Sequence, residues 1–142
     1  MSLIGNVMSK EKIITVPYPG EDGFSVDIRY MNREALSKLR EKCLKLKWNK
    51  LTRKQEEEVD FEKFTEEYAR QALIGWKGLT PAILATLIPI DLEKMSKEEI
   101  EFSTEDAIAL MKNSTPFDQW IGDCMNDIEK FSKAKHEDNV KN

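Results

Sequence analysis

The stretch Ile74–Leu79 reads IGWKGL and sets the largest apolar side chain, Trp76, between two glycines. It directly follows a segment with helical periodicity. Glycine costs about 1 kcal/mol in a helix interior, and it is favoured in the left-handed conformation just past a helix end. The spacing therefore predicts that a helix ends at Gly75 and Gly78. We expect Trp76 to plug the corner that follows, with its indole N–H on a backbone carbonyl.

The apolar run after this corner, residues 80–90, reads TPAILATLIPI. Thr80 followed by Pro81 is typical of an N-cap and a first helical position, so we expect a short helix over 81–88 that Pro89 ends. Such a helix has too many large apolar side chains for a small core to bury them all. Burial in the monomer and a partner surface both remain open. The candidate partner-binding residues are Trp76, Leu79, Ile83, Leu84, Leu87 and Ile88.

Upstream, two segments with strand-like patterns of side chains lie on either side of a cluster of turn residues. Phe24, Val26 and Ile28 alternate with polar residues, the period of a half-buried strand. Glycine and proline at 19–23 mark the turn, so the sequence predicts a β-hairpin over about 13–30 with one face on the core. Pro17 should lie at an edge or a strand end.

The next expected element is a helix from about Arg33 to Trp48, capped by Asn32. Residues 49–59 are polar and are expected to form a loop or a short strand around 50–54. The predicted apolar stripe of the helix consists of Leu36, Leu39, Cys43 and Leu46.

Three further helices are expected, each with a polar cap. Asp60 caps the helix that reaches the corner, Ser103 caps a helix carrying Ile108 and Met111, and Thr115 caps the last one. A short strand is expected over 99–102. The inner face of the first of these helices is expected to be Phe61, Phe64, Tyr68 and Ala72, and that of the last Phe117, Trp120, Ile121, Cys124, Met125, Ile128 and Phe131.

Together these elements predict an α+β fold, a small antiparallel β-hairpin or sheet packed against a mainly helical bundle of about four helices. An isolated hairpin is marginal in water, so it must pack on the helices. We expect a flexible leader over 1–10, one domain over 11–131 and a polar tail over 132–142.

Composition narrows the function. The 142 residues carry a net charge of −4, so no global basic excess points to nucleic acid. No segment has the ~20 apolar residues of a membrane helix, and no signal peptide is apparent. The two cysteines form no pair motif, which suits free buried thiols in a reducing cytoplasm. His136 is the only histidine, which argues against catalytic triads and histidine metal sites. We therefore expect no enzyme, cofactor or metal site.

Two charge runs carry alternative functions. The basic residues between Lys38 and Lys54 could follow a phosphate backbone, which would make the protein a small nucleic-acid-binding regulator with its basic face over 38–54. The acidic residues between Glu56 and Glu67 could hold a cation or supply paired carboxylates. Simple solvation explains both runs more economically.

The order of motifs resembles the tail assembly chaperones of long, non-contractile-tailed phages and their prophages. The motifs are MNREALSKLREKC, the ALIGWKGL junction, Glu-Ile-Glu-Phe-Ser before a capped helix, and NSTPFDQWI. Residues 80–98 depart from the pattern as an insertion. The resemblance implies a non-enzymatic protein that binds the tape measure protein during tail assembly, keeps its hydrophobic helices soluble and helps to recruit tail tube subunits. Self-association is a further possibility.

Overall fold

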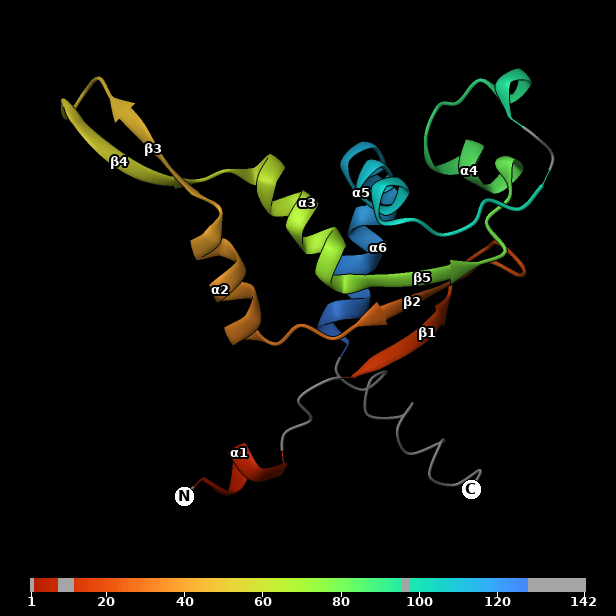
Figure 1. Cartoon of the computed structure of the whole chain (residues 1–142), viewed down its shortest axis with the longest axis horizontal. Coiled ribbons are helices and arrows are strands. Elements are labelled where there is room, and N and C mark those ends of the chain that lie inside the picture. Colours follow the sequence, from red (N-terminus) through yellow and green to blue (C-terminus); the bar gives the residue numbers. More distant parts are fainter. Residues whose placement is uncertain (1, 8–11, 96–97, 128–142) are drawn as a thin grey trace.

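The computed structural model describes residues 2–7, 12–95 and 98–127 (Figure 1). Its helices and strands confirm the α+β class. In chain order they are α1 (Leu3–Val7), β1 (Ile13–Pro17), β2 (Ser25–Arg29), α2 (Arg33–Lys42), β3 (Leu44–Asn49), β4 (Lys54–Val59), α3 (Phe61–Ala72), β5 (Leu73–Lys77), α4 (Pro81–Leu87), the 3-10 turn η1 (Leu92–Lys94), α5 (Thr104–Asn113) and α6 (Thr115–Asn126).

The predicted hairpin is confirmed as strands β1 and β2. They pair antiparallel with Ile14 opposite Ile28 and Val16 opposite Val26, and these side chains are buried. β1 is an edge strand of a three-stranded sheet with the order β1-β2-β5. Pro17 is its last residue, as expected for a residue without a backbone N–H.

The third strand corrects the reading of the IGWKGL stretch. Helix α3 ends at Ala72 and the chain continues directly into β5, which pairs antiparallel with β2 and sets Trp76 opposite Val26. Gly75 is therefore a strand residue rather than a helix stop. A Cβ there would lie 2.9 Å from a carboxylate oxygen of Asp27, beside an irregularity in the β2–β5 register. Its missing side chain permits this close strand approach.

Gly78 is required for a different reason, its backbone conformation. It adopts a positive φ of 79°, and an added Cβ would lie 1.8 Å from the carbonyl oxygen of Gly23. The chain leaving β5 thus crosses the turn of the β1–β2 hairpin at a separation that only glycine allows.

Helices α3, α5 and α6 pack together and cover one face of the sheet (Figure 1). Alternate residues of β1 and β2 are buried, which is the pattern of a sheet with one covered face. Phe117 and Ile121 of α6 are fully buried in the same core. The Ser114 side chain, also buried, caps α6 by accepting a hydrogen bond from the Phe117 N–H. The cap was expected one residue later, at Thr115.

The predicted helix over 33–48 is wrong in its second half. Asn32 does cap α2, but α2 ends at Lys42, and Leu44–Asn49 is strand β3, paired with β4 in a separate two-stranded sheet. Leu46, expected on the buried stripe, is 64% exposed. Cys43 is buried, and its carbonyl accepts a hydrogen bond from the Asp60 N–H at 2.7 Å across the base of this ribbon.

Smaller differences concern single residues. Asp60 caps α3 as predicted, but Phe61 is exposed instead of inward-facing. The segment 99–102 forms no strand. Ile128 and Phe131 lie outside the described residues, as does the whole predicted tail over 132–142.

Candidate protein-interaction surfaces

The corner at Trp76 is built as predicted, although from a strand. The Trp76 indole N–H donates to the carbonyl of Ile100 at 2.9 Å. Its ring meets Phe102 edge-on, with centroids 4.9 Å apart and planes at 82°. The Ile100 N–H in turn donates to the Leu79 carbonyl at 2.6 Å. These contacts fix residues 99–102 against the end of β5 and close one end of the core.

Helix α4 also begins as predicted, with Thr80 accepting a hydrogen bond from the Ile83 N–H and Pro81 in the first turn. The six predicted partner-binding residues divide into two groups. Trp76, Leu79, Ile83 and Leu87 are at most 9% exposed and belong to the monomer core, whereas Leu84 and Ile88 are half-buried. A partner can therefore reach this region mainly through Leu84 and Ile88.

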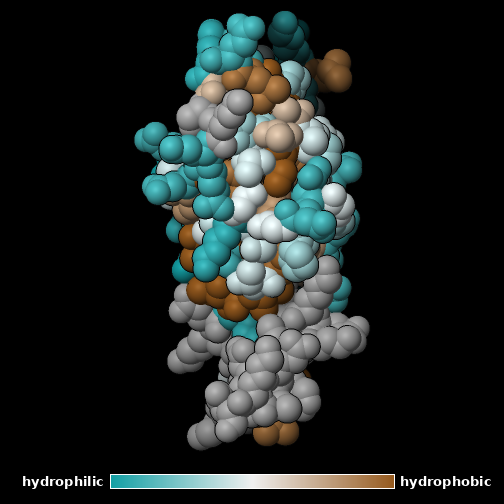
Figure 2. All heavy atoms as spheres, turned by 90° about the vertical axis from the view of Figure 1, so that its right-hand side faces the viewer, coloured by the Kyte–Doolittle hydropathy of each residue, from teal (hydrophilic) through white to brown (hydrophobic). Residues whose placement is uncertain are grey.

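These two half-buried residues line an apolar pocket of about 140 Å³ between α4, α5 and the segment leading into α5. Figure 2 shows this end of the molecule, where apolar side chains reach the surface between polar ones. Asp106 is the charged residue among those that form the pocket wall. The full wall consists of Trp76, Leu79, Leu84, Ile88, Met95, Ile100, Asp106, Ala109 and Leu110.

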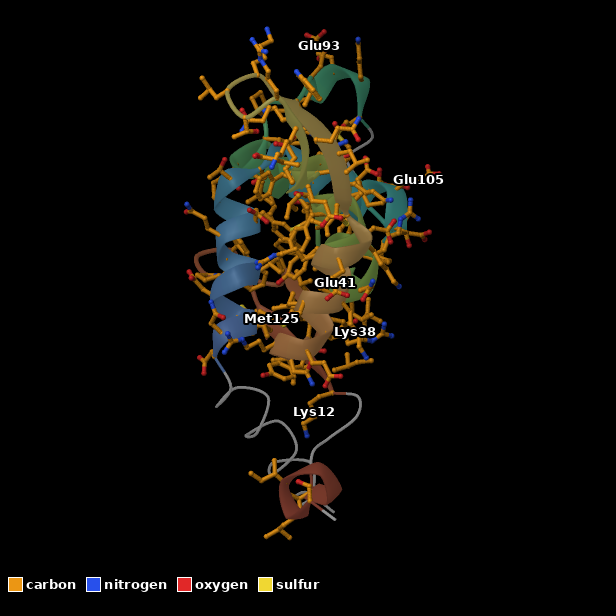
Figure 3. All side chains as sticks on the ribbon, turned by 90° about the vertical axis from the view of Figure 1, so that its left-hand side faces the viewer. Lys12, Lys38, Glu41, Glu93, Glu105 and Met125 are labelled. Atoms are coloured by element: carbon orange, nitrogen blue, oxygen red, sulfur yellow. The ribbon has the colours of Figure 1, made fainter. Side chains whose placement is uncertain are left out.

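The described chain around the pocket, residues 91–95 and 98–106, is strongly acidic. Its described acids are exposed, and Figure 3 shows Glu93 and Glu105 pointing outward into solvent. One basic residue, Lys94, lies among them. The acids are Asp91, Glu93, Glu98, Glu99, Glu101, Glu105 and Asp106. The pocket therefore has an apolar interior and a negative surround.

A second surface lies at the opposite end of the molecule, on the ribbon formed by β3 and β4, which we call the arm (residues 44–59). The arm projects from the body at the left of Figure 1. Leu44, Leu46 and Trp48 share one of its faces because side chains alternate along a strand. They are 39%, 64% and 56% exposed. This apolar face has no described element packed against it.

The other face of the arm is polar and internally paired. Lys45 and Lys47 each approach Glu58, with N–O distances of 3.7 and 3.6 Å, and Asn49 donates to Glu56 at 3.0 Å. Exposed pairs of this kind contribute little to stability. Burying their charges would cost free energy, whereas covering Leu46 and Trp48 would gain it, so the apolar face is the better candidate for a partner.

The tip of the arm combines one apolar side chain with three cations. Leu51 is 95% exposed. Within the described part of the chain, the side chains of Lys50, Arg53 and Lys54 have no ion-pair partner. The turn is ordered by Asn49, whose side-chain carbonyl accepts from the Leu51 N–H at 2.9 Å.

Sequence reasoning missed the arm, although a signal was present. Leu44, Leu46 and Trp48 alternate with Lys45 and Lys47, which is a strand pattern. The spacing of three between Cys43 and Leu46 fits a helix equally well, and it extends the apolar stripe of the preceding helix, so the sequence predicts a helix here. The basic residues between 38 and 54 consequently do not share one helix face, since the structure divides them between α2 and the arm.

The acidic run is also divided. Glu56 and Glu58 lie on the polar face of the arm, while Glu62 and Glu66 both accept hydrogen bonds from Lys112, at 2.8 and 3.0 Å. These bonds raise the pKa of Lys112. Over residues 2–7, 12–95 and 98–127, no three His, Cys, Asp or Glu side chains are grouped as a metal site would require.

Cys43 and Cys124 are both buried thiols, as the sequence predicted. Burial raises the pKa of the Cys43 thiol, which disfavours the reactive thiolate. Among the described helices, none is long and apolar enough to cross a membrane.

Comparison with known proteins places the chain in a family. Searches of curated proteins and of solved structures found no match. A family model described as YdaY prophage protein matches residues 21–142, which include strands β2 and β5, the arm, the corner at Trp76 and all the large helices, but not strand β1. The chain belongs to the YdaY prophage protein family.

Proposed function

We propose that this prophage protein is a non-enzymatic assembly chaperone that binds apolar helices of a partner through its arm. The observation that carries the proposal is the apolar face of the arm, where Leu46 and Trp48 are more than half exposed. Large exposed apolar side chains gathered on one face are typical of protein-interaction sites.

The shape of the arm favours a slender partner. A six-residue ribbon is about 20 Å long, so one of its faces is far smaller than the ~800 Å² that each partner contributes to a standard interface. A helix laid along the ribbon could cover Leu44, Leu46 and Trp48 with apolar residues at helical spacing. Glu57, directly opposite Leu46, is exposed on this face. It suits a helix that also carries lysine or arginine.

The proposed partner is the tape measure protein of the same prophage, with tail tube protein as a further candidate. The order of motifs resembles tail assembly chaperones, and family membership supports a prophage role. Tape measure helices are long and apolar, and the arm supplies an apolar contact without an enzymatic site. Such binding would take place in the host cytoplasm during tail assembly.

The test is co-expression with the prophage tape measure protein. In the variant Leu46→Ser/Trp48→Ser we expect the partner to become insoluble, because the apolar face is lost while the body of the protein is untouched. The matched control Lys45→Ser/Lys47→Ser changes the other face of the same strand and should preserve solubility. A tape measure protein that is equally soluble with both variants would refute the proposal.

The corner residues need a separate variant. Ile83→Asp/Leu87→Asp would place two charges in the core and unfold the protein. Leu84→Ser/Ile88→Ser instead alters the half-buried pair at the pocket. Loss of partner solubility in this variant alone, with the fold intact by circular dichroism, would move the binding site from the arm to the pocket.

A further inference from the structure

We propose that copies of this chain assemble head to tail, with the tip of the arm of one copy docked in the α4–α5 pocket of the next. The tip is defined by Lys50, Leu51, Arg53 and Lys54, and the pocket by the residues around Leu84 and Ile88. The proposal is independent of tape measure binding, which uses the face of the arm.

The two surfaces match in charge. Residues 44–54 contain five basic residues and no acidic one, whereas the described residues 91–95 and 98–106, which lead along the pocket, contain seven acidic residues and one basic residue. Lys50, Arg53 and Lys54 have no ion-pair partner in the described part of the chain. Opposite potentials on two surfaces steer their encounter and fix its orientation.

The two surfaces also match in size and polarity. Leu51 is 95% exposed at the end of the turn, between cations. The pocket measures about 140 Å³ and its wall is apolar except for Asp106. An apolar cavity of about 150 Å³ accommodates benzene, so this pocket can seat one leucine side chain. The basic neighbours of Leu51 would then face the acids at the pocket edge.

The arm projects at the left of Figure 1, whereas helix α4, which carries Leu84 and Ile88 of the pocket wall, lies at the right. The contact is therefore made between copies. Because the two surfaces differ, each copy offers one tip and one pocket, and repetition produces a ring or an open chain. A single leucine and a few ion pairs form a small interface, so assembly should depend on concentration.

A symmetric dimer through the arm is disfavoured by charge. Antiparallel pairing of two β4 strands would bring Glu56, Glu57 and Glu58 of both copies together, and pairing of two β3 strands would do the same with Lys45 and Lys47. Like charges directly opposite each other on neighbouring strands destabilise a sheet. The arrangement that satisfies both surfaces is the heterologous one.

Sedimentation velocity and light scattering of the full chain test the proposal. We expect species heavier than the 16.5 kDa monomer at high protein concentration. They should dissociate when NaCl is raised from 0.1 to 1 M, which shortens the screening length from ~10 to ~3 Å. Leu51→Asp should leave only monomer, whereas Leu3→Asp, at an exposed leucine of α1, should assemble as wild type does.

The pocket, the other half of the proposed contact, is blocked by Ala109→Arg. This substitution adds bulk and positive charge at an exposed helical position of the pocket wall. This variant should also be monomeric. Asn113→Arg on the same helix lies outside the pocket wall and should not disturb assembly. Circular dichroism confirms that each variant is folded.

Mixing the two blocked variants gives the decisive result. Leu51→Asp retains a pocket and Ala109→Arg retains a tip, so an equimolar mixture should form a one-to-one heterodimer and nothing larger. A monomeric wild type at millimolar concentration would overturn the proposal, as would assembly that survives Leu51→Asp or a mixture that stays monomeric. The tape measure experiment fails or succeeds separately, since it depends on Leu46 and Trp48.

Discussion

Two tryptophans of this protein occupy opposite environments. Trp76 is 7% exposed, is hydrogen-bonded to Ile100 and joins the sheet to the segment before α5, whereas Trp48 is 56% exposed on the arm. A buried aromatic side chain stabilises a fold through the area it removes from water. An exposed one contributes little to the monomer and is available for a partner. The body thus holds the buried aromatic contacts that stabilise the fold, and the arm carries the surface that we propose for partner contact.

The largest expected difference comes from truncating each tryptophan. Trp76→Ala should lower the free energy of unfolding by about 3–5 kcal/mol, because it leaves a cavity and an unpaired Ile100 carbonyl. Trp48→Ala should change the free energy of unfolding by less than about 0.5 kcal/mol. Urea denaturation followed by circular dichroism measures both. Equal losses would mean that the arm is part of the folded core.

The next largest loss in the free energy of unfolding is expected from substituting Gly78, where the chain crosses the turn of the β1–β2 hairpin. Gly78→Ala should cost at least about 2 kcal/mol, from the positive φ and the collision with Gly23. Gly122→Ala is the matched control in α6, where an added Cβ meets nothing within 4 Å. The control should be neutral or stabilise by up to about 1 kcal/mol. A harmless Gly78→Ala would contradict the close approach.

High pH should weaken the body through Tyr68. Burial, with a smaller effect of Asp118, raises the pKa of Tyr68 from 10.0 to about 12. The fold therefore favours the neutral phenol. The resulting contribution to the free energy of unfolding is on the order of 2 kcal/mol. It is fully present below pH 10 and is lost as pH rises towards 12.

Tyr68→Phe removes the ionisable group and should flatten the stability profile between pH 10 and 12. Urea denaturation at several pH values measures this effect, and ultraviolet titration of the phenolate checks the pKa itself. If both proteins lose the same stability over this interval, Tyr68 is not the responsible group.

The smallest expected effect lies in the arm. Glu58→Gln removes the ion pairs with Lys45 and Lys47, which are exposed, and should change global stability by less than about 0.5 kcal/mol. Hydrogen exchange should nevertheless show faster exchange for β3 and β4 amides than for β2, since an isolated ribbon opens locally. Exchange of arm amides as slow as that of β2 would place the arm in the cooperative core.

The sequence predicts the elements whose signals are local. Asn32, Asp60, Thr80 and Ser103 cap helices where expected, because a cap depends on residues only three positions apart. The β1–β2 hairpin follows from alternation and turn residues for the same reason.

Strand β5 could not be predicted in this way. Its formation depends on β2, about fifty residues earlier, and Gly75 reads as a helix breaker until Asp27 is known to lie against it. The burial of the predicted partner-binding residues could not be predicted for the same reason, because burial depends on residues that are distant in the sequence. Four of the six predicted partner-binding residues belong to the core. Trp76 is an example, since Ile100 and Phe102 contact it from more than twenty residues further along the chain, and no local pattern reports that contact.

The base of the arm has a consequence for how this chain can vary. Leu44 and Val59 face each other, and the Asp60 N–H bonds the Cys43 carbonyl just below them. The polypeptide therefore leaves the body and returns to it at almost the same point. We expect the ribbon to tolerate lengthening, shortening or exchange for a foreign hairpin while α2 and α3 stay in place. A change confined to this ribbon would then alter the surface that we propose for partner binding while the scaffold beneath it stays the same.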